Sequence, residues 1–130
     1  MKIFNKNVIK LLPLTFSAFL INTPVMAGNA AAGKTIYDTT GACATCHGTG
    51  GAGDGAAAVA LPAPKPTNFV AGAYRLDTDG DGKKGSHTDI SNVIKNGAAK
   101  YSGNAIMPAR ADFSDTQIND LVAYLLSLKK

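Results

Sequence analysis

The chain has 130 residues, which is the length of a single domain. It carries 13 Lys and Arg against nine acidic residues, and three of the lysines lie in the first ten positions, so the rest of the chain is nearly neutral. This balance excludes nucleic-acid binding, which needs clustered positive charge.

Residues 1–27 have the three parts of a secretory signal peptide. A basic start is followed by an apolar run at 11–21, and Ala27 marks the predicted cleavage site; the basic residues are Lys2, Lys6 and Lys10. The alternative is a retained membrane anchor, but the run has about 11 residues where a bilayer needs about 20, and Pro13 interrupts it. We therefore predict cleavage of 1–27, a mature domain over 28–130 with no membrane span, and export to the periplasm.

A helix is predicted over residues 29–40, where several alanines favour helical structure. Gly33 lies in its middle, at a cost of up to about 1 kcal/mol relative to alanine. A glycine at such a position typically allows another backbone to approach closely. Ile36 and Tyr37 are expected to face the interior, and Gly41 ends the helix.

Residues 43–47 read C-A-T-C-H, the C-x-x-C-H attachment pattern of a c-type haem. Two cysteines three positions apart lie on one face of a helical turn, so both sulfurs can reach the two vinyl groups of one porphyrin. The imidazole of the next residue can then point at the iron. We therefore predict one haem c, bound covalently through Cys43 and Cys46, with His47 as an axial ligand.

Three other interpretations of the cysteine pair are weaker. A redox dithiol requires a thioredoxin-like βαβ context, which the sequence lacks. A structural zinc site needs four ligands, and the only other histidine is the distant His87. A disulfide across two intervening residues is strained and closes almost no chain entropy.

Two irregular segments follow the attachment pattern. Residues 48–55 match G-x-G-x-x-G by letter, but a dinucleotide site needs a preceding strand, so we expect a tight loop near the haem edge. Residues 61–69 contain three prolines, which exclude regular structure. This segment is expected to wrap the proximal side of the porphyrin, where a carbonyl flanking a proline would accept the Nδ1 proton of His47. The alternative is a plain surface loop.

Residues 77–82 read D-T-D-G-D-G, and Asp77, Asp79 and Asp81 match the first ligands of an EF-hand calcium loop. The glutamate that such a loop needs at its twelfth position is replaced by Thr88, and a lysine directly follows the acidic run. Binding of Ca2+ by the three aspartates is therefore the less favoured alternative to an exposed Asp/Gly turn.

Two further helices are predicted. The first covers residues 88–96, with Ser86 or Thr88 as its N-cap. The second starts at Ser114, where Gln117 completes a capping box, and its apolar residues recur at helical spacing: Ile118, Leu121, Val122, Leu125 and Leu128. No segment alternates as a strand does, so the predicted fold is all-α.

The second axial ligand is predicted to be Met107, the only methionine after position 27, in the loop 98–113. Pro108 stiffens this position, and a thioether stabilises ferrous over ferric iron. The alternatives are Met107 as core filler, His87 as the ligand, and a vacant position that binds gas or peroxide. His87 lies in a polar Gly/Lys/Ser-rich stretch, which favours an exposed imidazole.

The motifs in this order resemble those of the class I monohaem cytochromes c, which are small bacterial electron carriers. The resemblance covers nearly all of residues 28–130 and rests on the signal peptide, the C-x-x-C-H pattern, the glycine-rich segment after it, Met107-Pro108, and the L-V-A-Y-L ending. It implies an all-α fold of three to five short helices around one haem, and iron ligands at His47 and Met107.

The same resemblance implies that the N- and C-terminal helices cross, so that Gly33 and Tyr37 meet Leu121 and Tyr124. The chain departs from the family in its longer acidic stretch at 77–85 and in having no tryptophan to hold a haem propionate. That role would fall to one of three residues, Tyr74, Arg75 or Tyr101.

With both axial positions filled by protein, substrate has no place to bind the metal. We therefore predict an outer-sphere electron carrier rather than an enzyme, with redox partner proteins that dock transiently. The alternative is a haem-containing relay subunit of a larger periplasmic oxidoreductase complex.

Overall fold

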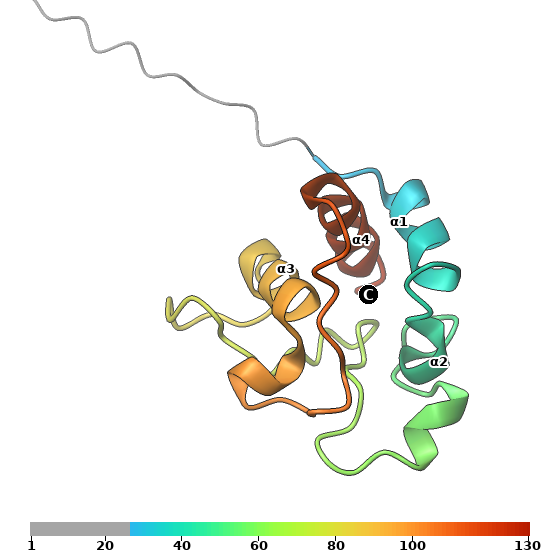
Figure 1. Ribbon diagram of the computed structural model, residues 1–130, viewed down its shortest axis with the longest axis vertical. Helices are drawn as coiled ribbons and strands as arrows, with labels where there is room; N and C mark the ends of the chain where they lie inside the picture. Colours follow the sequence, from blue (N-terminus) through green and yellow to red (C-terminus); the bar gives the residue numbers. More distant parts are fainter. Residues whose placement is uncertain (1–26) are drawn as a thin grey trace, which may run out of the picture.

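A computed structural model describes residues 27–130, and all of its regular elements are helical (Figure 1). The predicted signal peptide lies outside the described residues, except for Ala27. In chain order the elements are α1 (Ala30–Asp38), α2 (Ala44–His47), the 3-10 helix η1 (Ala56–Val59), α3 (His87–Asn96), the 3-10 helix η2 (Ala98–Tyr101) and α4 (Asp115–Ser127). Within this part of the chain, no helix has the length and apolar character needed to cross a membrane. The all-α prediction is confirmed.

Helix α1 begins after an N-cap residue, Asn29, and crosses α4 at a glycine, Gly33. The side-chain oxygen of Asn29 accepts hydrogen bonds from the N–H groups of Ala31 and Ala32, which would otherwise lack partners. A methyl group added at Gly33 would overlap the backbone carbonyl of Asp120 in α4. The glycine therefore lets the two helix backbones touch, as predicted.

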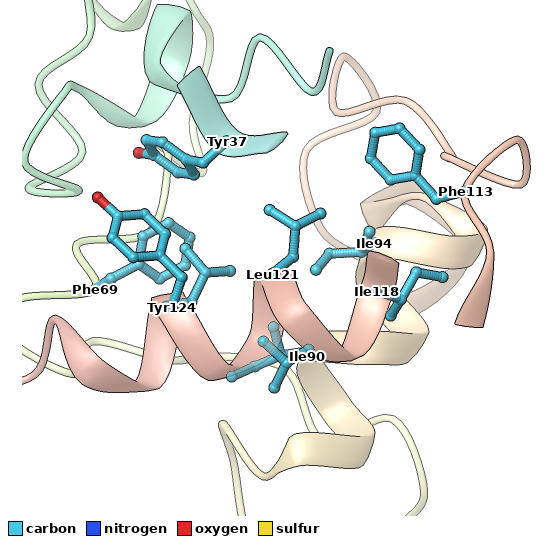
Figure 2. Packing of buried hydrophobic residues seen from close by; sticks show 10 residues of the cluster. Tyr37, Phe69, Ile90, Ile94, Phe113, Ile118, Leu121 and Tyr124 are labelled. Carbon is cyan, nitrogen blue, oxygen red and sulfur yellow. The ribbon is translucent and has the colours of Figure 1, made fainter. Parts of the chain in front are cut away.

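The core lies around this crossing (Figure 2). Tyr37 is fully buried, and its ring meets that of Tyr124 edge-on with 5.2 Å between the ring centroids. Leu121 is buried beside it. The predicted contact between the terminal helices is therefore confirmed. Burial raises the pKa of Tyr37, so its hydroxyl stays protonated and donates to the carbonyl of Gly48 at 2.6 Å.

Helix α3 completes the core from the other side of α4 (Figures 1 and 2). Its N-cap is Ser86, not Thr88, because the Ser86 and Asp89 side chains each accept the other's backbone N–H. The capping box at the start of α4 is present as predicted. The inner faces of these helices form one cluster with residues of the loops: Phe69, Ile90, Ile94, Phe113, Ile118, Leu121, Val122 and Leu125.

The two 3-10 helices were not predicted. Each has four residues, and η2 lies within the segment expected to be a loop. Elements this short are too brief to produce a periodic apolar pattern. Both are rich in alanine, so their sequences also carry little contrast between faces.

Candidate functional site

A cavity of about 720 Å3 lies in the middle of the described residues. This volume is typical of cofactor sites. Its wall is mostly apolar. It combines α2, residues 61–69 (the proline segment), α3, the loop before α4, and α4 itself. All four residues predicted to hold a haem line this one cavity: Cys43, Cys46, His47 and Met107.

Cys43, Cys46 and His47 share one helical turn, as their spacing predicts. The N–H of Gly41 caps α1 by donating to the carbonyl of Ile36 at 2.7 Å, and the chain then turns directly into α2. Within α2 the N–H of His47 donates to the carbonyl of Cys43 at 2.9 Å. Both cysteines are partly buried, and burial raises the pKa of Cys43. All three residues therefore line the cavity from one wall.

The surroundings of His47 leave its Nε2 free to bind a metal. Its Nδ1 lies 3.2 Å from the carbonyl oxygen of Thr67. Because a carbonyl can only accept, Nδ1 carries the proton and Nε2 keeps its lone pair. Burial lowers the pKa of His47, against the opposing effect of this hydrogen bond, so the neutral imidazole is favoured. The acceptor belongs to the proline segment, as expected, but it is the carbonyl of Thr67, one residue beyond those that flank Pro66.

The ring of Phe69 fixes the plane of the imidazole. It lies parallel to the ring of His47, with 4.8 Å between centroids and 25° between planes. Phe69 is itself buried in the core, so the proline segment holds His47 both by a hydrogen bond and by stacking. The proline pattern predicts a segment on the proximal side, but nothing in it singles out Phe69.

Met107 reaches the same cavity from the chain before α4, which runs apart from α2 in Figure 1. Its N–H donates to the carbonyl of Asn104 at 3.1 Å, and its carbonyl accepts from the N–H of Ala98 at 3.4 Å. His87, the alternative ligand, is exposed in the first turn of α3 and does not line the cavity. Of the two candidates, only Met107 shares a site with His47.

The charged residues on the cavity wall are all cations, Lys65, Arg75 and Arg110, as far as the described residues go. Cationic and hydroxyl groups suit the carboxylates of a haem. Arg75 and Tyr101, two of the three residues considered for the propionates, line the cavity. Tyr74 does not. Its hydroxyl is buried without a hydrogen-bond partner in this part of the chain, and Tyr74 lines a smaller adjoining cavity of about 60 Å3 that shares His47 and Met107 with the main one.

The glycine-rich loop 48–55 supports α2 from behind instead of lining the cavity. The N–H groups of Gly53 and Gly55 donate to the carbonyls of His47 and Cys46 at 2.8 and 3.2 Å. A methyl group on Gly55 would overlap the backbone of α2. The expected tight loop is present, and it packs against the C-x-x-C-H turn; its expected approach to the haem edge stays a prediction.

The acidic stretch gathers a different set of carboxylates from the one predicted. Asp77 and Asp79 lie together with Asp89 of α3, with oxygens within 4.8 Å of one another, and Asp81 is not in this group. Asp77 accepts the N–H groups of Gly80 and Gly82 at 2.7 and 2.9 Å. The carboxylates thus already serve as acceptors for the turn.

Asp89 is only 2% exposed and accepts hydrogen bonds from Thr78 and Ser86. Burial tends to raise the pKa of Asp89, but these hydrogen bonds outweigh it and lower the value. The sequence pattern could not reveal this residue as part of the acidic group because it lies on the next helix.

A C-x-x-C-H turn, a histidine with a free Nε2 and a methionine that share one apolar cavity define a class of protein that carries a covalently attached haem. The chain belongs to the cytochrome c family, whose model matches residues 30–129. It is therefore an electron-transfer protein with haem c, and the family resemblance noted in the sequence is confirmed.

Two curated relatives have similar lengths. Cytochrome c-555 of Chlorobaculum tepidum is 35% identical over 121 residues, which cover 90% of this chain and 93% of that protein. Cytochrome c-554(547) of Halothiobacillus neapolitanus is 32% identical over 103 residues, covering 79% of this chain and 100% of that protein.

A solved structure shares the fold. A chain of the Kuenenia stuttgartiensis reducing HAO-like protein complex Kustc0457/Kustc0458 matches with a TM-score of 0.62 at 30% identity. The match covers 79% of the present chain but only 44% of that one. The present chain therefore spans less than half of the solved chain.

Proposed function

We propose that the protein is a monohaem electron carrier, in which Cys43 and Cys46 hold the haem while His47 and Met107 ligate its iron. The observation that carries this proposal is that all four residues line one apolar cavity. The two iron ligands, His47 and Met107, are 60 positions apart in the sequence. The cavity volume, the free Nε2 of His47 and the guanidinium of Arg75 on the cavity wall all fit the group.

Each part of the chain has a defined task in this proposal. The haem supplies a one-electron couple. Thr67 and Phe69 orient the imidazole, and the thioether of Met107 favours the reduced state. The apolar wall excludes water. Because His47 and Met107 would both hold the iron, no position would remain for a substrate at the metal, so we place the protein among carriers and not among enzymes.

The experiment is a reduced-minus-oxidised optical spectrum of the exported protein, with and without carbon monoxide, for wild type and Met107→Ala. We expect wild type to show the weak sulfur-to-iron charge-transfer band and not to bind carbon monoxide. The Met107→Ala variant should lose the band, bind carbon monoxide and have a lower reduction potential, because the soft ligand is gone. Val59→Ala, at an exposed apolar residue that does not line the cavity, is the control and should behave as wild type.

A mass measurement on the same sample tests attachment and processing. We propose cleavage after Ala27 and periplasmic localisation. The mass should equal that of residues 28–130 plus one haem. A colourless product with the mass of the bare peptide would contradict both covalent attachment and the carrier function.

The second candidate is a relay subunit within a larger periplasmic oxidoreductase complex. It is favoured by the solved match, in which a domain of this fold is part of a longer chain in a multiprotein complex. Size-exclusion chromatography of the native extract separates the two functions. A free carrier elutes at the size of a small monomer together with its colour, whereas a relay subunit co-elutes with a large complex.

Calcium binding by Asp77, Asp79 and Asp81 stays the less favoured alternative to an exposed turn, and the carboxylates that lie together are those of Asp77, Asp79 and Asp89. A melting temperature that is the same with calcium and with chelator would exclude it.

A further inference from the structure

The segment that carries Met107 has no helix of its own. Residues 102–114 lie between η2 and α4 without regular structure. A loop of this kind loses considerable conformational entropy when it is held in one position. Something other than secondary structure must therefore keep the Met107 thioether in the cavity.

Asn104 fastens this loop to the proline segment. Its Nδ2 donates to the carbonyl oxygens of Pro62 at 2.9 Å and Pro64 at 3.0 Å, so both amide protons are used. Its Oδ1 accepts the N–H of Ile106 at 2.9 Å. One side chain thus closes the local turn before Met107 and joins that turn to residues about 40 positions earlier in the chain.

The proline segment is a firm anchor, and it also holds the other axial ligand. Lys65 donates from Nζ to three carbonyls, those of Ala58, Val59 and Leu61, at 2.7 to 3.1 Å. Thr67, two residues further on, accepts the Nδ1 proton of His47. The same short segment therefore contacts His47 directly and the Met107 loop through Asn104.

Arg110 holds the other end of the loop. Its guanidinium donates to the carbonyls of Thr40 and Gly41 at 3.0 and 3.1 Å, just before the C-x-x-C-H turn. It also lies over the ring of Phe113, 3.8 Å from the centroid. Met107 thus lies three residues after Asn104 and three residues before Arg110. The carbonyls that these two side chains bind belong to the segments on either side of the C-x-x-C-H turn.

We propose that Asn104 is a positioning residue for Met107. By donating to the Pro62 and Pro64 carbonyls, its amide keeps the Met107 thioether at the iron and couples that side of the site to the segment that orients His47. The inference rests on the proposed function, in which Met107 is an axial ligand.

The test is Asn104→Asp in the haem-loaded protein. Aspartate keeps an oxygen for the Ile106 N–H but replaces the donating NH2 by an oxygen that faces two carbonyl oxygens. The local turn survives and the link across the cavity is lost. Losing two hydrogen bonds should raise the fraction of molecules with an open loop by at least about tenfold. Added imidazole should bind the ferric protein faster by that factor, with a weaker charge-transfer band and a lower reduction potential.

The matched control is Asn92→Asp. The Nδ2 of Asn92 donates to the Thr78 hydroxyl at 3.0 Å, and the change adds the same charge. Neither residue lines the cavity or lies in the Met107 loop. The control should therefore keep the wild-type imidazole rate and charge-transfer band.

Asn104→Ser supplies a milder version, because one hydroxyl can replace only one of the two donors. It should lie between wild type and the Asp variant, and it decides the question if the Asp variant fails to mature. An imidazole rate and band equal to wild type in the Asn104 variants, even with a lower melting temperature, would overturn the proposal. A wild-type protein without the band would instead refute Met107 ligation, which is a separate failure.

Discussion

At the scale of single residues, two buried tyrosine hydroxyls allow a direct comparison. The hydroxyl of Tyr37 donates to the Gly48 carbonyl, whereas that of Tyr74 has no partner in the described residues. Tyr37→Phe should therefore lower the free energy of unfolding by about 1 kcal/mol. Tyr74→Phe should leave it unchanged or raise it, since a buried hydroxyl without a partner is unfavourable.

Denaturant unfolding of the haem-loaded variants measures both values, provided that the slope with denaturant concentration is the same as for wild type. An equal loss in the two variants would contradict the prediction. It would mean that the Tyr74 hydroxyl has a partner in the loaded protein, such as a haem propionate or a water molecule in the small cavity that Tyr74 lines.

At the scale of elements, the fold depends on how closely α1 and α4 can approach. Alanine is the better helix former by about 1 kcal/mol, so propensity alone predicts that Gly33→Ala stabilises the protein. The added methyl group would however overlap the Asp120 carbonyl, and overpacking of this kind typically costs about 1–3 kcal/mol. We expect a net loss of stability, measured as a lower melting temperature.

Gly50→Ala is the control for this substitution, because nothing lies within 4 Å of the methyl group that it would add. It should be close to neutral. A Gly33→Ala variant that is as stable as wild type would show that the two helices can move apart at no cost.

The helices were predictable because their signals are local. The N-caps lie next to the helices that they begin: Asn29, Ser86 and Ser114. Gly33 indicates that another backbone approaches α1, but it does not indicate which one. The C-x-x-C-H turn was predictable for the same reason. Asn104 and Arg110 were not, because each acts on carbonyls 40 to 70 positions away. A side chain that binds backbone carbonyls leaves no matching residue type at the other end, so no sequence pattern reveals the pair.

At the scale of the whole molecule, the cavity and the hydrophobic core share residues, so the cavity is part of the core. Its wall takes residues from α1, α2, α3 and α4, among them core residues such as Tyr37, Ile94 and Leu121. A domain of about 100 residues is already marginal on its own core. Without the haem, the mostly apolar wall of this cavity of about 720 Å3 would be exposed to water, so the folded state would lose the stabilisation that comes from burying it.

We therefore expect the haem to be required for folding. A ligand that binds only the native state stabilises it by linkage, and here the attachment is covalent. The double variant Cys43→Ala/Cys46→Ala should lack haem, show little helical circular dichroism and have no cooperative unfolding transition. Met107→Ala keeps both thioethers and should stay helical, which separates loss of the haem from loss of one ligand. A haem-free protein that melts cooperatively would show that the helices α1, α3 and α4 form a sufficient core without the cofactor.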